Sequence, residues 1–402
     1  MNSLSLQTIR EAAAALQGVA HNTPLDRSST FSNMIGAPVY LKLENLQKTG
    51  SFKLRGAYNK IHLLDVVEKK RGVIAASAGN HAQGVAYAAS HAGIRSVIVM
   101  PETAPLSKVS ATRGYGAEVV LAGTSYDEAF ARAQELERAQ GLTFVHAFND
   151  DQVMAGQGTI GLEILRELPE LSTVVVPIGG GGLIAGVATA IKAIAPQVRV
   201  VGVQAAGADA MAQSKQSGCL TPTASASTIA DGIAVKSPGD RTFEVIRQVV
   251  DEIVIIDDEA IAAAILMLLE RGKLMVEGAG AVGLAALLNG KVAAAGPIAC
   301  IISGGNIDVN FIARIIERGL VKAGRRSIIT TRVPDRPGML QKMLSVIAGS
   351  KGNVLHVYHD RLNHSVPLGQ CEVQVSMETR DNDHTAEIIV ALQQEGYCVA
   401  KS

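Results

Sequence analysis

The fold class of this chain is decided by the segment Thr173-Val174-Val175-Val176-Pro177-Ile178-Gly179-Gly180-Gly181-Gly182-Leu183-Ile184-Ala185. A run of β-branched residues is followed by four glycines and then by small and apolar residues, which predicts a buried strand, a tight loop and a helix. The uncharged run continues to Ile191 and is nearly long enough to cross a bilayer, but four consecutive glycines would destabilise a membrane helix. We therefore expect an α/β unit and no membrane span.

The same alternation of strands and helices extends in both directions, from about residue 70 to residue 320. Apolar residues recur at helical spacing in 125–139 and 259–271. Alternating strands and helices predict right-handed crossovers and mostly parallel sheets. The early strands end near His146 and the later ones begin near Thr173, so we expect two lobes, a small one at about 73–150 inserted in a large one, with ligands at the carboxyl ends of the strands. The predicted strands are 72–76, 96–100, 118–121, 173–178, 198–203, 253–256 and 298–302.

The composition narrows the class of partner. The chain has 402 residues, 48% of them hydrophobic, so two or three domains are expected. Its formal net charge is zero, which gives no basic field for nucleic acid or an anionic membrane, so we expect the partner to be a small molecule or another subunit. The N-terminus lacks the layout of a signal peptide, which predicts a cytoplasmic protein. The cysteines are scattered without a C-x-x-C pair, which predicts reduced packing residues and no metal site: Cys219, Cys300, Cys371 and Cys398.

The regular alternation of strands and helices ends near residue 325. Strands are expected at 327–333, 353–361, 370–377 and 397–400, and helices at 339–348 and about 384–395. This order, βαββαβ, is that of the ferredoxin-like split unit. We therefore predict a catalytic domain at 1–325, a linker at 322–326 and a separate small domain at 327–402.

Lys53 is the residue of greatest chemical interest, in Gly50-Ser51-Phe52-Lys53-Leu54-Arg55-Gly56. We expect Ser51 to cap a helix whose first turn contains Lys53. The helix dipole and the exclusion of water by Phe52 would then favour the neutral amine, which can form a Schiff base with an aldehyde. A surface lysine at a helix start is the alternative, and the rest of the chain decides between the two.

Three glycine-rich loops follow predicted strands and lead into helices, at 77–81, 179–183 and 303–306. Their backbone N–H groups favour an anion, and the tetraglycine loop is the best phosphate cradle because no side chain blocks close approach. Residues 180–185 also satisfy the G-x-G-x-x-A dinucleotide pattern, so a nicotinamide-linked oxidoreductase is an alternative. That alternative needs an acidic residue at the end of the next strand, where this chain has Gln204.

A lysine, an anion cradle and two further polar loops together meet the requirements of pyridoxal 5'-phosphate. Residues 1 to about 320 resemble the fold type II pyridoxal phosphate enzymes, and specifically the threonine dehydratases or threonine ammonia-lyases. The resemblance rests on four blocks in that family's order and spacing, 50–57, 77–84, 179–183 and 303–306. The tail resembles an ACT domain, a small module that commonly binds amino acids, through a looser motif at Asp335-Arg336-Pro337-Gly338.

The resemblance implies a role for each matched position. Lys53 would be the catalytic residue, bonded to the cofactor and later the base that removes the substrate's α-proton. Phe52 would lie against the pyridine ring, Asn80 would bond the 3'-oxygen, and Ser303 would meet the pyridine nitrogen. Asn149 would line the same pocket. Two loops would receive the substrate carboxylate and the cofactor phosphate respectively: Ser77, Ala78, Gly79, Asn80 and His81, and Gly179, Gly180, Gly181, Gly182 and Leu183.

Several positions narrow the predicted reaction. Ser303 can donate a hydrogen bond but cannot hold the ring nitrogen protonated as a carboxylate would, which favours elimination of a β-substituent. Ala78 stands where serine-racemising relatives carry a hydroxyl base, so racemisation is not expected. Gln204 and Ala210 stand where those relatives bind a divalent cation, so we expect no Mg²⁺ or Ca²⁺ there. Glu277 matches a family acid near the ring, with a plain helix-start carboxylate as the alternative.

The predicted function is β-elimination of L-threonine, and less well of L-serine, to 2-oxobutanoate or pyruvate and ammonia. A dehydratase of another 3-hydroxy amino acid (serine or 3-hydroxyaspartate), the oxidoreductase, and an amino-acid sensor with vestigial catalytic lobes are the alternatives. In the ACT-like domain we expect Asp335 to cap a helix beginning near Pro337 and Asn353 to meet the ammonium group of an isoleucine or valine effector. We expect a homo-oligomer, a dimer or tetramer.

Overall fold

The computed structural model describes residues 3–362 and 365–401. The chain divides into two compact units, residues 1–307 and 308–402, and each has a hydrophobic core of its own. In the part of the chain that the structure describes, no helix is long and apolar enough to cross a membrane. The assignment of 1–325 and 327–402 as catalytic and ACT-like domains stays a prediction.

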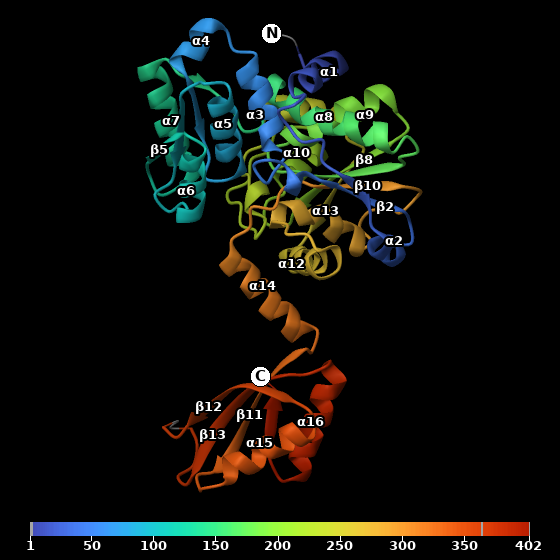
Figure 1. Cartoon of the computed structure of the whole chain (residues 1–402). Helices are drawn as coiled ribbons and strands as arrows, with labels where there is room; N and C mark the ends of the chain where they lie inside the picture. The colour runs from blue at the N-terminus through green and yellow to red at the C-terminus, as the bar shows by residue number, and fades with distance from the viewer. Residues whose placement is uncertain (1–2, 363–364, 402) are drawn as a thin grey trace. The chain divides into compact units, whose positions relative to one another are not determined.

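The small lobe of the first unit contains a parallel sheet in the order β5-β4-β3-β6. Figure 1 shows its edge strand β5 together with helices α5, α6 and α7 of the same lobe. The central strands β3 and β4 are buried along their whole length, as expected of a parallel sheet that helices cover on both faces. Their β-branched sequences therefore predicted the strands well. The elements of this lobe are β3 (Val73–Ala76), β4 (Ser96–Met100), β5 (Glu118–Leu121), β6 (Thr143–Phe144), α5 (Asn80–His91), α6 (Leu106–Gly114) and α7 (Tyr126–Gln140).

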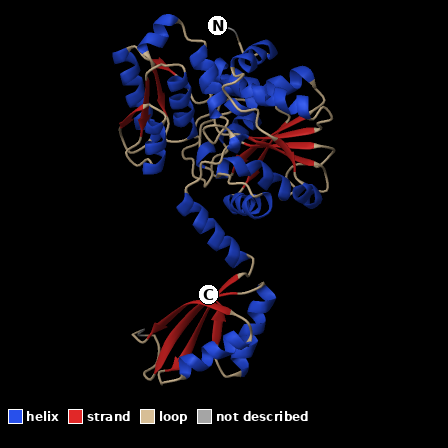
Figure 2. Ribbon diagram, viewed as in Figure 1, coloured by secondary structure: helices blue, strands red, loops and turns tan. Residues whose placement is uncertain are grey.

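The large lobe contains a mixed sheet in the order β1-β2-β10-β7-β8-β9, in which only β1 is antiparallel to its neighbour. Helices lie on both faces of this sheet (Figure 2). Its strands are β1 (Leu25–Arg27), β2 (Val39–Leu43), β7 (Thr173–Pro177), β8 (Arg199–Ala205), β9 (Glu252–Ile256) and β10 (Ile298–Ile302). Helix α4 (Val66–Arg71) directly precedes β3 and lies beside the small lobe in Figure 1. The helices of the large lobe include α1 (Leu6–Ala15), α2 (Ser29–Ile35), α3 (Lys53–His62), α8 (Asp151–Glu167), α9 (Gly182–Ile194), α10 (Ala210–Ser217), α11 (Asp240–Val249), α12 (Asp258–Met267) and α13 (Gly278–Leu288).

Strand β2 was not predicted, although it pairs in parallel with β10 and so joins the N-terminal segment to the later strands. The strand contains Lys42, a residue type that sequence patterns place on the surface. Here Lys42 is fully buried, and its Nζ lies 2.7 Å from the carboxylate of Glu163. A buried ion pair therefore concealed the strand.

The second unit contains an antiparallel sheet in the order β12-β13-β11-β14, and its six C-terminal elements follow the predicted βαββαβ order. Lys322 ends a helix and Arg326 begins a strand, so residues 323–325 are the part of the predicted linker that lies outside regular structure. The elements are α14 (Val309–Lys322), β11 (Arg326–Pro334), α15 (Met339–Gly349), β12 (Asn353–Asp360), β13 (Gln370–Glu378), α16 (Asn382–Gln394) and β14 (Val399–Lys401).

Two local predictions in the chain are wrong. Asp335 does not cap α15, because Gly338 occupies the N-cap position at φ +89° and Asp335 is paired with Arg361 instead. The cysteines are all free, but Cys219 and Cys398 are exposed, so a packing role fits only the two buried ones.

Candidate active site

Loops that are far apart in the sequence meet beside the start of α3. Ser51 forms an isolated antiparallel bridge with Gly304, the Phe52 N–H donates to the Ser303 carbonyl at 3.1 Å, and the Gly305 N–H donates to the Gly50 carbonyl at 2.9 Å. These bonds join the lysine segment to the loop after β10. Two of the sequence blocks singled out above therefore share one site.

Lys53 is the first residue of α3, but Ser51 is not its cap. Phe52 occupies the N-cap position, no side chain caps this helix, and Ser51 is held in the bridge to the loop after β10. The Nζ atom of Lys53 donates to the Ala147 carbonyl at 2.9 Å and lies 5.2 Å from the centre of the Phe52 ring. Burial lowers the pKa of Lys53 to about 8, against an opposing effect of the Glu277 carboxylate. Burial, which we expected from the exclusion of water, is the main cause of this lowered pKa, and the expected effect of the helix dipole stays a prediction.

The tetraglycine loop leads directly into α9 and leaves its N-terminus open. Gly181 has φ +96° and occupies the N-cap position, where no side chain makes a capping bond. A Cβ atom at Gly180 would lie 2.4 Å from the ring of Phe148, and one at Gly182 would lie 2.9 Å from the Cα of Phe148. Only glycine fits at these positions, and the free N–H groups of the helix start suit an anion.

The segment 146–149 packs against this loop, and only Asn149 in it was predicted to belong to the site. The Nδ1 atom of His146 accepts hydrogen bonds from the backbone N–H groups of Phe148 and Asn149, at 3.2 and 2.9 Å. Burial, followed by the nearby charge of Lys53, lowers the pKa of His146 to about 4, so its ring is neutral and can accept both bonds. His146 thereby fixes the turn whose carbonyl at Ala147 holds Lys53.

A chain of polar side chains joins three loops on the other side of the site. Asn80, the first residue of α5, donates to Glu277 at 2.6 Å and accepts from Asn306 at 2.8 Å. Asn306 also donates to the Thr49 carbonyl at 2.8 Å. Sequence reasoning named Asn306 only as the end of a loop, because its partners lie 226 and 257 residues away.

Glu277 is buried at the N-cap position of α13 but makes no capping bond, so it is not a plain helix-start carboxylate. Burial, and then the negative charge of Asp231, raise the pKa of Glu277 to about 7, although the bond from Asn80 opposes this shift. The sign matters, because a carboxyl group that is about half protonated at neutral pH stabilises a charged Lys53 less than a full carboxylate would.

Ser303 and the loop at 77–81, which were also predicted to belong to the site, lie in the first unit. Ser303 is buried at the end of β10, and its hydroxyl donates to the Ala279 carbonyl at 3.3 Å. In the loop at 77–81, the Gly79 N–H donates to the Ser77 hydroxyl at 3.2 Å, and Ala78 is half-buried.

The side chains of His81 and Asn149 form hydrogen bonds with other residues of the chain. The Nε2 atom of His81 lies 2.8 Å from the Val145 carbonyl, and burial lowers the pKa of its ring to about 3, so His81 orders the loop and does not carry protons. Asn149 donates to Asp240 at 2.7 Å, at the start of α11, so its predicted place beside the cofactor stays a prediction.

A buried ionic network lies next to the site and was also missed. Arg55, two residues after Lys53, is 1% exposed and bonds both carboxylate oxygens of Glu44, at 2.8 and 2.9 Å. It also bonds both oxygens of Glu163 on α8, at 2.6 and 2.9 Å. These bidentate contacts fix α3 against α8 and therefore fix the direction in which Lys53 projects.

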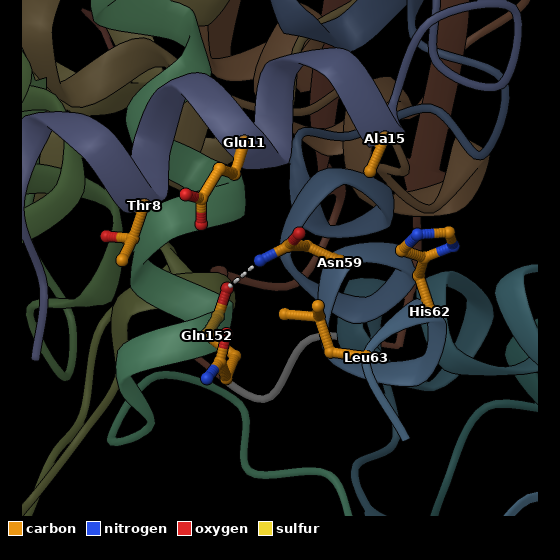
Figure 3. A pocket seen from close by; sticks show the side chains of 7 residues that line it. All are labelled: Thr8, Glu11, Ala15, Asn59, His62, Leu63 and Gln152. Atoms are coloured by element: carbon orange, nitrogen blue, oxygen red, sulfur yellow. Dashed lines mark hydrogen bonds between the residues drawn. The ribbon is translucent and has the colours of Figure 1, made fainter. Parts of the chain in front are cut away.

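A groove of about 340 Å³ lies near the opposite end of α3, between α1, α3 and α8 (Figure 3). Asn59 donates across its floor to the Gln152 carbonyl at 2.8 Å. None of the groove's residues belongs to the loops described above. Its lining consists of Thr8, Glu11, Ala15, Asn59, His62, Leu63 and Gln152.

Comparisons with known proteins agree with this geometry. A family model described as pyridoxal-phosphate dependent enzyme matches residues 16–304. An L-threonine ammonia-lyase of Thermotoga maritima is 52% identical over 394 residues, which cover 98% of this chain and 98% of that protein. Among solved structures, a maize serine racemase has a TM-score of 0.75 at 38% identity and covers 80% of this chain and 99% of its own. The processed form of threonine deaminase isoform 2 from Solanum lycopersicum has a TM-score of 0.74 at 40% identity and covers 77% of this chain and 92% of its own.

Proposed function

Since the chain belongs to the pyridoxal-phosphate dependent enzyme family, we propose that it is an L-threonine ammonia-lyase, which converts L-threonine to 2-oxobutanoate and ammonia. The observation that carries this proposal is the convergence of a half-buried lysine of lowered pKa, a side-chain-free anion cradle and a buried serine hydroxyl in one unit. The relative that is 52% identical over nearly the whole chain is named for the same reaction. The oxidoreductase alternative loses its support, because Gln204 bonds the backbone of Ala208 and Ala212 and no acid stands there.

The residues present fit pyridoxal phosphate. The N-terminus of α9 offers uncapped N–H groups at a loop where a Cβ would collide with Phe148, so a phosphate can approach the backbone closely. Lys53 has the lowered pKa that bonding to an aldehyde requires. Among the described residues, the buried Ser51 hydroxyl and the Nδ1 atom of His81 have no hydrogen-bond partner. Unpartnered buried polar atoms beside a binding loop are expected where a ligand supplies the partner.

When bound, pyridoxal phosphate supplies an aldehyde that bonds amines and a ring that withdraws electrons from the carbon next to the bonded amine. Lys53 would hold the aldehyde, residues 179–183 the phosphate, Asn80 the 3'-oxygen and Ser303 the ring nitrogen. The Nζ atom of Lys53 is the base that accepts the α-proton of threonine. With a pKa of about 8, a useful fraction of this amine is neutral near neutral pH, whereas an ordinary lysine would be almost fully charged.

The other site residues hold the Asn80 amide and the Lys53 amine in position. Asn306 holds Asn80 through one bond and Glu277 holds it through another, so the Asn80 amide is fixed in direction. His146 fixes the turn that positions the Lys53 amine. Loss of the α-proton and of the β-hydroxyl leaves an unsaturated amine, which hydrolyses to 2-oxobutanoate and ammonia.

The same residues favour elimination over racemisation. With the cofactor bound, the Ser303 hydroxyl would not hold the ring nitrogen protonated as a carboxylate would, which would favour departure of the β-hydroxyl group over accumulation of the Cα–H electrons on the ring. Racemisation also needs a second proton carrier on the opposite face, and Ala78 offers no such group. We propose that the maize serine racemase, despite its similar fold, differs from this chain in its reaction for these reasons.

The test is to supply L-threonine, L-serine and 3-hydroxyaspartate to the purified protein and to quantify the 2-oxo acid, ammonia and any D-amino acid. We expect 2-oxobutanoate and ammonia in equal amounts from L-threonine, less pyruvate from L-serine, and no D-isomer. If threonine gives no 2-oxobutanoate, the proposed activity is wrong. An absorption band of the lysine-bound cofactor that borohydride bleaches distinguishes all these lyase outcomes from an oxidoreductase or a sensor.

We further propose that the second unit is an ACT domain through which isoleucine or valine inhibits a homo-oligomeric enzyme, a dimer or tetramer. In its support, α15 begins after Gly338 without a side-chain cap, which leaves N–H groups for an effector's carboxylate. Asn353 is bonded to Glu378 at 2.7 Å, and we propose this pair for the effector's ammonium group. Removing residues 327–402 should abolish inhibition by these amino acids, and unchanged inhibition would contradict the proposal. Sedimentation of both forms measures the oligomeric state.

A further inference from the structure

Three side chains of the second unit, from separate segments, bring metal-binding atoms together. Asp335 follows β11, His359 lies on β12 and Cys371 lies on β13. One ligand atom of each lies within 4.8 Å of the other two. The closest pair is the Nε2 atom of His359 and the Sγ atom of Cys371, at 2.8 Å. A carboxylate, an imidazole and a thiol therefore point to one place.

The cluster depends on an irregularity in β12. Val354 pairs with Met377, but His356 pairs with Ser376, so one extra residue is inserted between them as a bulge. Without the bulge, His359 would pair with Glu372 and its side chain would project from the opposite face of the sheet, because faces alternate along a strand. With the bulge, His359 pairs with Val373 and shares the face of Cys371, two residues along β13. Bulges are commonly used to redirect a functional side chain in this way.

The surroundings of the three groups suit a bound cation. Asp335 is exposed and provides access from solvent, whereas Cys371 is 1% exposed and is anchored in the core of the unit. Arg361 donates to the Oδ1 atom of Asp335 at 3.0 Å, which orients the carboxylate. Metal-binding carboxylates are usually held by such a second contact. The Cys371 thiol also contacts the Val333 carbonyl, at 3.5 Å.

We propose that the second unit binds one zinc-class divalent cation through a carboxylate oxygen of Asp335, Nε2 of His359 and Sγ of Cys371. Mixed oxygen, nitrogen and sulfur ligands suit zinc, while Mg²⁺ and Ca²⁺ require several oxygens. Tetrahedral zinc with bonds of about 2.0–2.3 Å needs ligand atoms roughly 3.3–3.8 Å apart, which small side-chain rotations from the observed spacing supply. The thiol releases its proton to water when the metal–sulfur bond forms, and water fills the fourth position.

The site was not predicted from the sequence, where the scattered cysteines suggested no metal. Its expected effect is to tie the β12 edge strand to β13 and to the end of β11. A cation that binds only the folded unit raises its unfolding temperature in proportion to the logarithm of free metal concentration. The catalytic residues named above all lie in the first unit, so basal turnover of threonine should not depend on this cation.

The experiment uses the full-length holoenzyme, stripped with a chelator and titrated with Zn²⁺, and in parallel with Co²⁺ as an optical probe of the thiolate. We expect one cation per chain, about one proton released, and a thiolate-to-cobalt charge-transfer band. Cys371→Ala, His359→Gln and Asp335→Asn should each weaken binding by roughly 10-fold or more. Because Cys371 is buried, its variant can lose stability, and the other two variants keep the test valid.

The matched controls are Cys398→Ala and His356→Gln, which change an exposed thiol and an exposed imidazole of the same unit. Both should bind the cation as the unchanged protein does and give the same cobalt band. The proposal is overturned if the unchanged protein retains no zinc after gel filtration, or if His359→Gln and His356→Gln bind it equally well.

Discussion

Replacing Gly182 by alanine tests the central geometric claim about the anion cradle. Gly182 is the first residue of α9 with an ordinary backbone conformation, so the added methyl group causes no torsional strain. Its Cβ would lie 2.9 Å from both the Cα and Cβ of Phe148, about 0.5 Å short of ordinary contact at 3.4 Å. The backbone of 146–149 has to yield, and the same turn holds Lys53 through the Ala147 carbonyl. One methyl group therefore disturbs the phosphate loop and the base together.

The expected cost in stability is about 1–3 kcal/mol, the usual range for overpacking, which corresponds to a fall of roughly 2–6 °C in Tm. A displacement of half an ångström at the base should lower kcat/KM for threonine on the order of tenfold. Gly114→Ala is the control, because its Cβ would meet nothing within 4 Å at the end of α6. Cofactor affinity is measured by titration of the apoenzyme and turnover by ammonia release. A Gly182→Ala enzyme with the cofactor affinity and turnover of Gly114→Ala would refute the reasoning.

Three further predictions follow from the polar groups of the site. Lys53→Ala should abolish both the absorption band of the lysine-bound cofactor and ammonia release, and release at the normal rate would contradict its role. Asn306→Ala removes the donor to Asn80 and should cost about 1–3 kcal/mol, seen as a fall in kcat/KM on the order of tenfold or more, with cofactor binding weakened. Glu277 has a folded-state pKa of about 7 against a reference of 4.5, so the folded apoenzyme binds more protons than the unfolded chain between these values. Its stability should therefore fall by up to about 3 kcal/mol as pH rises from 4.5 to 7, and chemical denaturation of Glu277→Gln should show a flatter profile.

The sequence predicted those parts of the fold in which local pattern and tertiary environment agree. Strands 96–100, 118–121 and 298–302 have the predicted bounds because each is an apolar run between turns in a parallel sheet, and the first and the last are buried along their whole length. The lysine and the glycine loops were recognised because their chemistry is local. A tetraglycine is unusual in itself, and the collision that each Cβ would cause explains why the loop needs it.

The errors occur where a distant partner changes the role of a residue. Serine is a common N-cap residue, yet the backbone of Ser51 forms a β-bridge with Gly304. Lys42 looks like a surface residue, yet Glu163 compensates its charge in the interior. Asp335 has the sequence position of a helix cap, yet it forms an ion pair with Arg361. In each case a contact across many residues overrides a sound local preference, and no short pattern contains that information.

Lys53 and Glu277 show how such distant contacts produce chemistry that neither residue has alone. Burial favours the neutral form of each, which lowers the pKa of the amine and raises that of the carboxyl. A charged carboxylate would raise the pKa of Lys53 again, and so a protonated Glu277 helps to keep the amine neutral. Asn80 acts in the opposite direction, because its bond at 2.6 Å favours the carboxylate. The pKa of Glu277, and through it that of Lys53, therefore depends on burial and the charge of Asp231 on one side and on the Asn80 amide on the other. Asn306 holds that amide, so a residue outside the proton-transfer step affects how much of the enzyme has a neutral lysine.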